Sequence, residues 1–450
     1  MQRYLIILLA LGLGLLARAE PRITELASPA PLVSGTPRLH TGPDGTVYLM
    51  FAGPGLLQGE RAIWLSTLPA GSREWSVPGL VVSTPLLLEN WADFGTLVVA
   101  DDGQVWAQWF QSRAEGQRGY SGWMARSRDG GRTWSEPAPL GHEFVSLAPL
   151  SGGRVMAVWL QSARPPRPAG TPRPARTPRD PHAEHSHGPA RDPAAPYTPS
   201  MRLDARLMDA AGNTLREWVV DPDVCTCCHT TLAVLPGDGL FVSYRGHNRE
   251  EVRDNWIAHF DGQEWGAPAV LHPDGWIIPA CPVNGPAASA RANELAIVWF
   301  TAANGISRVS GKFSTDAGRR FGEALPIDLG RPMGRVDCVM LPDNTAAASW
   351  LEAKSSGNAA GIYLRTFDAA GLISVPWLVA ETSQARASGF PRLALRADGD
   401  LVIAYTEEGK ESRIRTLLLS QPPAPSEPAA GFTGPFSSAL KEDRRHEHAH

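Results

Sequence analysis

Four cysteines in two short stretches are the residues of this sequence best suited to chemistry. Cys225, Cys227 and Cys228 are followed directly by His229, and Cys281 lies further along the chain. Thiolates with a histidine are the ligands that Cu(I) or Zn(II) prefers. The alternative is a pair of structural disulfides in an oxidising compartment, although the adjacent Cys227 and Cys228 cannot bond each other without strain. Both interpretations remain open at the level of sequence.

Alternating histidines recur in two polar segments. They are His182, His185 and His187 within residues 162–200, which are rich in Pro, Arg and His, and His446, His448 and His450 at the end of the chain. Such compositions favour flexible, exposed chain. We interpret the histidines as a weak collector of Cu(II), Ni(II) or Zn(II), with an incidental tail as the alternative. The fifth cysteine, Cys338, is typical of a buried apolar residue.

Seven short apolar stretches, each with an aromatic residue near its end, recur along the chain. The aromatic residues are Phe51, Trp109, Trp159, Tyr244, Trp299, Trp350 and Tyr405, at steps of 58, 50, 85, 55, 51 and 55 residues. The 85-residue step contains the 162–200 segment, and removing that segment restores the common period. A period near 50 residues is typical of one four-stranded blade per repeat. The sequence therefore predicts an all-β fold, a β-propeller of seven four-stranded blades, with six blades as the alternative.

Glycine-containing turns support this prediction. The turns Asp101-Asp102-Gly103 and Ala397-Asp398-Gly399 each separate two apolar stretches, as in a tight hairpin. The chain contains Gly 44, Pro 40 and Trp 15, and no stretch shows a sustained helical period. We expect the hairpins to be the two inner strands of each blade. We also expect the segment Ile23-Thr24-Glu25-Leu26 to supply the outer strand of the last blade.

Two motifs resemble known proteins. The run Ser127-Arg128-Asp129-Gly130-Gly131-Arg132-Thr133-Trp134 resembles the Asp-box, Ser-x-Asp-x-Gly-x-Thr-Trp, of the sialidase superfamily with bacterial neuraminidase repeats, and a weaker copy begins at Ser314. The resemblance implies a propeller in which Asp129 closes a turn and is no catalyst. The CxCC motif at 225–228 with the run from Cys281 to Pro286 resembles a group of exported bacterial proteins described as sialidase-like.

The resemblance also implies where a ligand would bind. In this superfamily the residues just before each inner strand and just after each aromatic strand share one face, and three arginines from different blades hold a sugar carboxylate. A guanidinium matches a carboxylate with two parallel hydrogen bonds. The candidates in this chain are Arg38, Arg245 and Arg392. The alternative for Arg38 and Arg392 is a polar pore rim that pairs with Asp93 and Asp337.

Sialidases further require a tyrosine nucleophile activated by a glutamate, and an aspartic acid as acid or base. The candidates in suitable loops are Tyr244 or Tyr405, Glu352 or Glu407, and Asp93. None of these residues stands in a motif of the superfamily. We therefore expect the arginines to face one mouth of the propeller without a tyrosine–glutamate pair beside them. The alternative role of the tyrosines is packing at the strand ends.

The remaining segments indicate an exported protein. Arg3, the apolar run from Tyr4 to Leu16 and the small residues before Glu20 are typical of a signal peptide over residues 1–19. We expect the propeller over 20–420, with 162–200 as a loop insertion, and a flexible tail over 421–450. A periplasmic or secreted location follows, without a membrane span, because no later segment offers 18 apolar residues. A net charge of −4 does not indicate a nucleic-acid-binding protein.

Three hypotheses on function follow. The first is a sialidase-like propeller that binds a glycan, or acts on it as a glycoside hydrolase with an incomplete catalytic set. The second is a copper- or zinc-handling or redox protein that uses the cysteines and His229. The third is an interaction scaffold with disulfide-stapled loops. Fold alone does not choose among them, because one fold hosts many functions.

Overall fold

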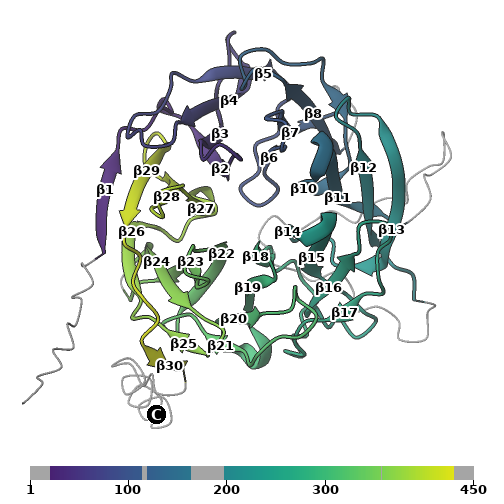
Figure 1. Ribbon diagram of the computed structural model, residues 1–450, viewed down its shortest axis with the longest axis vertical. Coiled ribbons are helices and arrows are strands. Elements are labelled where there is room, and N and C mark those ends of the chain that lie inside the picture. Colours follow the sequence, from purple (N-terminus) through teal and green to yellow (C-terminus); the bar gives the residue numbers. More distant parts are fainter. Residues whose placement is uncertain (1–20, 114–118, 164–196, 356, 430–450) are drawn as a thin grey trace, which may run out of the picture.

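The chain folds into a ring of seven antiparallel sheets, which confirms the seven-bladed β-propeller (Figure 1). The computed structural model describes residues 21–113, 119–163, 197–355 and 357–429. The predicted leader and all six histidines of the two polar segments lie outside these ranges. No helix within them is long and apolar enough to cross a bilayer.

Blades 1 to 4 each contain four consecutive strands, ordered from the ring centre outwards. Blade 1 comprises β2 (Gly35–Thr41), β3 (Val47–Pro54), β4 (Arg61–Leu68) and β5 (Gly79–Thr84). Blade 2 comprises β6 (Thr96–Val99), β7 (Val105–Ser112), β8 (Tyr120–Ser127) and β9 (Ala138–Pro139). Blade 3 comprises β10 (Glu143–Pro149), β11 (Val155–Ser162), β12 (Met201–Met208) and β13 (Thr214–Val224). Blade 4 comprises β14 (Thr231–Leu235), β15 (Gly239–Arg245), β16 (Asn255–Phe260) and β17 (Ala269–Val270).

The last three blades complete the ring. Blade 5 comprises β18 (Ala287–Arg291), β19 (Glu294–Thr301), β20 (Arg308–Ser314) and β21 (Leu325–Pro326). Blade 6 comprises β22 (Pro332–Met340), β23 (Ala346–Ala353), β24 (Ala359–Phe367), β25 (Leu372–Ile373) and β26 (Trp377–Ser383), and β30 (Glu427–Pro428) pairs with β25. Blade 7 comprises β27 (Arg392–Leu395), β28 (Leu401–Glu407), β29 (Arg413–Ser420) and β1 (Arg22–Leu26). Four short 3-10 helices lie in turns, η1 (Ser151–Gly153), η2 (Pro236–Asp238), η3 (Ala303–Gly305) and η4 (Arg386–Ser388).

The seven recurring aromatic residues occupy equivalent places, as the repeat predicts. Each lies in the second strand of its blade, and all seven are buried. The turn before that strand is tight, and Gly103 and Gly399 adopt φ values of 82° and 88° there. Residues with a Cβ atom rarely adopt this conformation, so the turns require glycine. The inner hairpins were therefore correctly predicted.

The hydrophobic core lies between the blades. Each large cluster of buried apolar side chains joins the faces of two neighbouring blades, such as blades 3 and 4 or blades 5 and 6. Flat sheets that stack face to face bury apolar side chains on both sides. The second strand of every blade is consequently apolar along nearly its whole length, as in Val47–Pro54 of β3.

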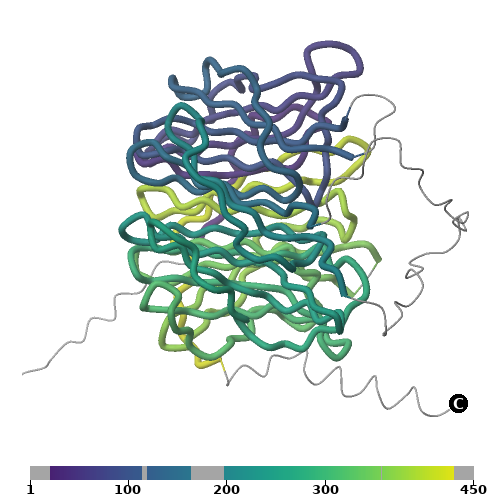
Figure 2. Tube along the Cα trace, turned by 90° about the vertical axis from the view of Figure 1, so that its right-hand side faces the viewer, coloured from purple at the N-terminus to yellow at the C-terminus, as the bar shows by residue number. Residues whose placement is uncertain are grey.

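The N-terminal strand closes the ring. β1 pairs with β29 in antiparallel register from Arg22 opposite Ser420 to Leu26 opposite Thr416, which confirms the predicted outer strand of the last blade. In Figure 2 the purple start of the described chain lies next to the yellow strands of the last blade. The hydroxyl of Thr41 in blade 1 also donates to the carbonyl of Leu395 in blade 7 at 2.7 Å. The first and last blades are thus held next to each other.

Two aspartates close turns on the face opposite the starts of the inner strands. Asp129 accepts a hydrogen bond from the Thr133 hydroxyl at 2.6 Å and from the Thr133 amide at 2.9 Å. Asp316 accepts from the Arg320 amide at 2.8 Å in the corresponding turn of blade 5. The Thr133 hydrogen bonds hold the pKa of Asp129 well below its usual range. Both carboxylates therefore stabilise their own turns.

The ends of the 162–200 segment meet in a regular hairpin. Ser162 pairs with Met201 at the end of β11 and β12, and the Ala163 amide donates to the Ser200 carbonyl at 3.0 Å. The blade is complete without the residues between these ends. We expect deletion of residues 164–196, with a short Gly-Ser linker in their place, to leave the free energy of unfolding within about 1 kcal/mol of the wild type. Chemical denaturation measures this, and a loss above about 2 kcal/mol would contradict it.

Candidate functional site

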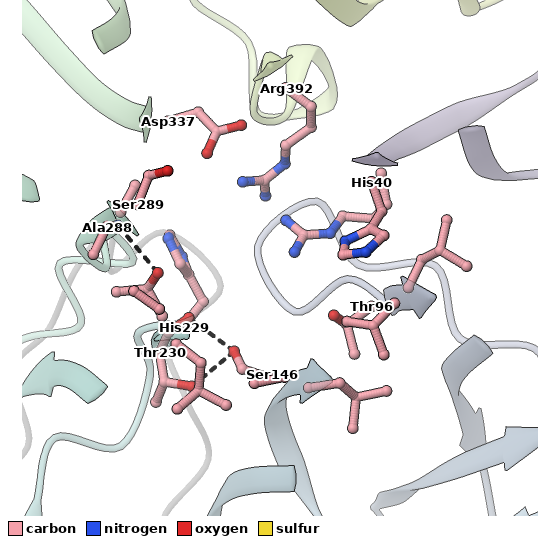
Figure 3. A pocket seen from close by; sticks show the side chains of 18 of the residues that line it. His40, Thr96, Ser146, His229, Thr230, Ala288, Ser289, Asp337 and Arg392 are labelled. Carbon is pink, nitrogen blue, oxygen red and sulfur yellow. Dashed lines mark hydrogen bonds between the residues drawn. The ribbon is translucent and has the colours of Figure 1, made fainter. Parts of the chain in front are cut away.

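A cavity runs along the axis of the ring and receives residues from all seven blades. Its volume is about 330 Å³, within the size range of small-ligand pockets. Six residues that the sequence places at the starts of inner strands line it, namely Arg38, Asp93, Ser146, His229, Asp337 and Arg392. In Figure 3, Arg392 and Asp337 lie on one side of the cavity, and Ser146 and Thr230 lie on the other. The cavity is the candidate ligand site.

Two guanidinium groups dominate the cavity. Arg38 and Arg392, here called the arginine pair, both lie against the ring of Phe94, with their Cζ atoms 5.0 and 4.1 Å from its centroid. Within the described residues, no carboxylate lies within 4 Å of either group. Nε of both residues and Nη2 of Arg392 are buried without a hydrogen-bond partner. Buried donors without partners are costly, so this arrangement favours an anion as the missing partner.

Electrostatics point in the same direction. Burial lowers the pKa of both guanidinium groups, and the mutual repulsion lowers the pKa of Arg392 further. Asp337 partly offsets this repulsion, but its carboxylate already accepts from the amides of Cys338 and Leu393 at 3.0 and 2.9 Å. The cavity therefore holds an excess of positive charge that a bound anion would relieve.

Aromatic and hydroxyl groups complete the lining. The rings of His229 and Phe390 pack edge to face, 4.9 Å apart, and His229 also contacts Phe94 at 5.4 Å. Burial lowers the pKa of His229 well below its usual range, so its imidazole is neutral, and its Nε2 has no partner among the described residues. The hydroxyls of Ser146 and Thr230 lie 2.9 Å apart. A ligand with hydroxyl groups would meet both polar and apolar contacts here.

The third predicted arginine, Arg245, does not join the arginine pair. Its guanidinium donates to the carbonyls of Asn284 at 2.8 Å, Arg253 at 2.6 Å and Phe300 at 2.8 Å, and packs over Trp276. These bonds join the loops of blades 4 and 5. The structure thus gives Arg245 partners that a pore-facing ligand would have to displace.

The predicted tyrosines and glutamates are not paired with each other. The Tyr244 hydroxyl donates to Asp221 at 2.6 Å in the core. Glu352 accepts from the Trp350 indole at 2.6 Å and from the Leu329 and Arg331 amides. Glu407 forms an ion pair with Arg413 at the edge of blade 7, and the buried Tyr405 lies within that blade.

Asp93 lies at the cavity wall but is almost completely enclosed. It accepts hydrogen bonds from the Tyr120 hydroxyl at 2.6 Å and the Phe144 amide at 2.9 Å. Burial raises the pKa of its carboxyl group to about 8. A carboxyl group that stays protonated at neutral pH adds no negative charge beside the arginine pair.

A second constellation lies outside the cavity. The sulfur atoms of Cys225, Cys227 and Cys228, here called the thiol cluster, all lie within 4.8 Å of one another. This loop leads from β13 of blade 3 to β14 of blade 4. The thiol of Cys281, from the loop before β18, lies 4.0 Å from the Thr226 hydroxyl, and a hydrogen bond from Cys227 lowers its pKa to about 7. The structure therefore brings all four cysteines together, none of them bonded to another.

The two cysteine loops approach each other closely. A Cβ atom added at Gly285 would lie 2.0 Å from the carbonyl oxygen of His229, so a residue without a side chain is required there. His229 itself faces the cavity and is not part of the group of three sulfur atoms. Cys338 is buried among apolar side chains of blades 5 and 6.

Three contributors were missed at the level of sequence. Phe94 follows Asp93 directly, and Phe390 lies two residues before Arg392. An aromatic residue this close to a predicted pore-facing residue is the pattern in the sequence that could have indicated them. Arg253 donates from Nη1 to the Cys225 sulfur at 3.2 Å. Arg253 lies in the loop between β15 and β16 of blade 4, on the face shared by the residues that follow the aromatic strands.

The comparisons with known proteins support the fold. No protein-family model and no curated protein matches the sequence. The BP39L lectin from Burkholderia pseudomallei matches with a TM-score of 0.50 and 12% identity, over 85% of this chain and 98% of the lectin. The GH93 alpha-L-arabinofuranosidase of Fusarium graminearum matches at a TM-score of 0.43 and 12% identity, over 88% and 94%. The Hadza microbial sialidase Hz136 matches at 0.40 and 14%, over 71% and 63%. At its identity, the likeness to the lectin shows a shared fold and nothing finer.

The raised pKa of Asp93 predicts a pH-dependent stability. Between about pH 4 and about pH 8 the folded protein keeps a proton that the unfolded chain releases, so stability falls as pH rises, by up to about 1.4 kcal/mol per pH unit. Asp93→Asn mimics the protonated carboxyl and should remove this dependence. Denaturation of both proteins across this range measures it. If the stability of both proteins changed with pH in the same way, the raised pKa of Asp93 would be contradicted.

Proposed function

We propose that this protein binds a small carboxylate-bearing sugar in its central cavity without hydrolysing it. The observation that carries the proposal is the arginine pair, two neighbouring guanidinium groups that face one cavity with donors unused by the described residues. Paired guanidinium donors match the two oxygens of a carboxylate. The ligand occupies the position that the sequence resemblance implies for a sugar acid.

Three further features support a sugar as the body of the ligand. The cavity volume of about 330 Å³ suits one sugar ring with its substituents. Hydroxyls from Ser146 and Thr230, with the unpartnered Nε2 of His229, offer hydrogen bonds to ligand hydroxyls. The structural neighbours include a lectin and enzymes named for glycans, and we extend that ligand class to this chain as part of the proposal.

Binding without hydrolysis is favoured because the candidate catalytic side chains already have hydrogen-bond partners within the protein. The Tyr244 hydroxyl is fully enclosed and bonded to Asp221, and Glu352 holds a loop of blade 6. Neither residue is available to attack or activate a ligand at the arginine pair. At the cavity wall Tyr120 contacts the carboxyl group of Asp93, but the raised pKa of Asp93 keeps that group protonated at neutral pH, so it is no base for the tyrosine.

Binding should depend on the arginine pair and on ligand charge. We expect N-acetylneuraminate or a hexuronate to bind in calorimetric titration, and neutral hexoses of similar size to bind far more weakly. Arg392→Ala should weaken acid binding by about 10- to 100-fold, because charge-assisted hydrogen bonds contribute about 1.5–3 kcal/mol. Arg392→Lys keeps the positive charge but lacks the paired donors of a guanidinium, so its affinity should lie between those of the wild type and Arg392→Ala.

The matched control is Arg128→Ala, which removes an exposed arginine on the opposite face. Its binding should equal that of the wild type. Arg392→Ala should also melt no lower than the wild type, because it removes the repulsion with Arg38. Equal binding of acidic and neutral sugars, or undiminished binding by a folded Arg392→Ala variant, would contradict the proposal.

Hydrolysis should be undetectable. We expect no release of the fluorophore from a fluorogenic sialoside at saturating concentration, since Tyr244 is bonded to Asp221 and Glu352 to the Trp350 indole. The assay is continuous fluorescence with a known sialidase as the positive control. Turnover that disappears in Tyr244→Phe or Glu352→Gln would restore the hydrolase hypothesis.

A further inference from the structure

The thiol cluster has the spacing of a metal site. A zinc or copper ion bound to thiolates at about 2.3 Å places its sulfur ligands about 3.8 Å apart. The Cys225 and Cys227 sulfur atoms are 3.7 Å apart, and Cys228 completes a triangle within 4.8 Å. One pair of sulfur atoms therefore has the spacing of two ligands on one ion, and the third lies close enough to complete the set with a small movement of the loop.

The surroundings are arranged for negative charge. Cys225 and Cys228 are 1% and 2% exposed, and a buried thiolate is costly unless a cation accompanies it. Arg253 supplies that cation, with Nη1 at 3.2 Å from the Cys225 sulfur and Nη2 on Glu251 at 2.7 Å. The Cys225 amide donates to the Arg245 carbonyl at 3.0 Å, which fixes the start of the loop. Such outer contacts orient ligands and tune a bound metal.

The ligand set distinguishes among metals. Structural zinc sites are almost always tetrahedral with four protein ligands. Here His229 faces the cavity and Cys281 is exposed outside the group of three sulfur atoms, which leaves three thiolates as the enclosed set. Soft thiolates suit both Cu(I) and zinc, and an enclosed set of three without a fourth protein ligand favours Cu(I) over tetrahedral zinc. Cys281 then stands at the solvent-facing side, in hydrogen-bond contact with Cys227.

We propose that Cys225, Cys227 and Cys228 bind one Cu(I) ion as a three-thiolate site, with Arg253 offsetting its negative charge and Cys281 at its solvent-facing side. Binding forms three copper–sulfur bonds and releases the thiol protons to solvent, with no change in oxidation state. The site is separate from the arginine pair, so it does not depend on the ligand of the cavity.

The test uses the full-length, fully reduced protein under anaerobic conditions. Cu(I) is delivered from a competing chromophoric chelator, and its transfer and the thiolate-to-copper absorption band in the ultraviolet are followed. The histidine segments give no such band, so the signal reports on cysteine. We expect one Cu(I) per chain and three sulfur ligands by X-ray absorption.

Variants distinguish a metal site formed by these three cysteines from non-specific binding to single thiols. Cys227→Ser, at a partly exposed position, should bind Cu(I) more than about 100-fold more weakly, because even outer-contact losses cost about 10- to 100-fold. Arg253→Gln should weaken binding by about 10- to 100-fold. Cys281→Ser should bind close to the wild-type level, and Cys338→Ala is the matched control because that thiol is buried in the core of blades 5 and 6.

Four outcomes would overturn the proposal. One is no Cu(I) transfer to the reduced wild-type protein, and another is equal affinity in a folded Cys227→Ser variant. The third is a zinc-bound protein with four sulfur ligands that is lost in Cys281→Ser, which would identify a tetrahedral zinc site instead. A Cys227–Cys281 disulfide that resists reduction in the folded protein would also exclude the copper site.

Discussion

Antiparallel pairing of β1 with β29 is the constraint on which the rest of the structure depends. It places the first described strand in the same blade as the three strands from Arg392 to Ser420, and so joins blade 7 to the start of the chain. Because the ring closes there, Arg392 of blade 7 comes to lie beside Arg38 of blade 1 against one phenylalanine ring. The arginine pair exists only in the closed ring. Loss of closure would therefore remove the candidate site together with the fold.

The cavity illustrates how a site can oppose stability. Two buried cations near each other, a neutral histidine whose Nε2 lacks a partner among the described residues, and a carboxyl group with a raised pKa all cost free energy in the empty protein. The apolar packing between blades supplies enough stability to tolerate them. By contrast, Arg245 satisfies its donors with backbone carbonyls and holds two blades together. Similar residue types on the same face thus keep unused donors in one case and hold loops together in another.

The two proposed sites share one loop. The residues Cys225 to Cys228 form the thiol cluster, and the next residue, His229, lies on the cavity wall beside Phe94. A metal ion that draws the three sulfur atoms together acts on the segment that carries this histidine. The close contact at Gly285 ties the same segment to the loop of Cys281.

The sequence by itself determined the blade number, the inner hairpins and the closing strand, because these follow from local patterns of apolar residues, aromatic residues and glycine turns at a regular period. It also placed the polar residues and the cysteines on one face. It could not decide which arginines are free, since Arg38, Arg245 and Arg392 have the same chemistry and similar positions. That outcome depends on neighbouring loops far away in the chain, such as the carbonyls of Asn284 and Phe300. Only the tertiary structure brings those hydrogen-bond partners into place.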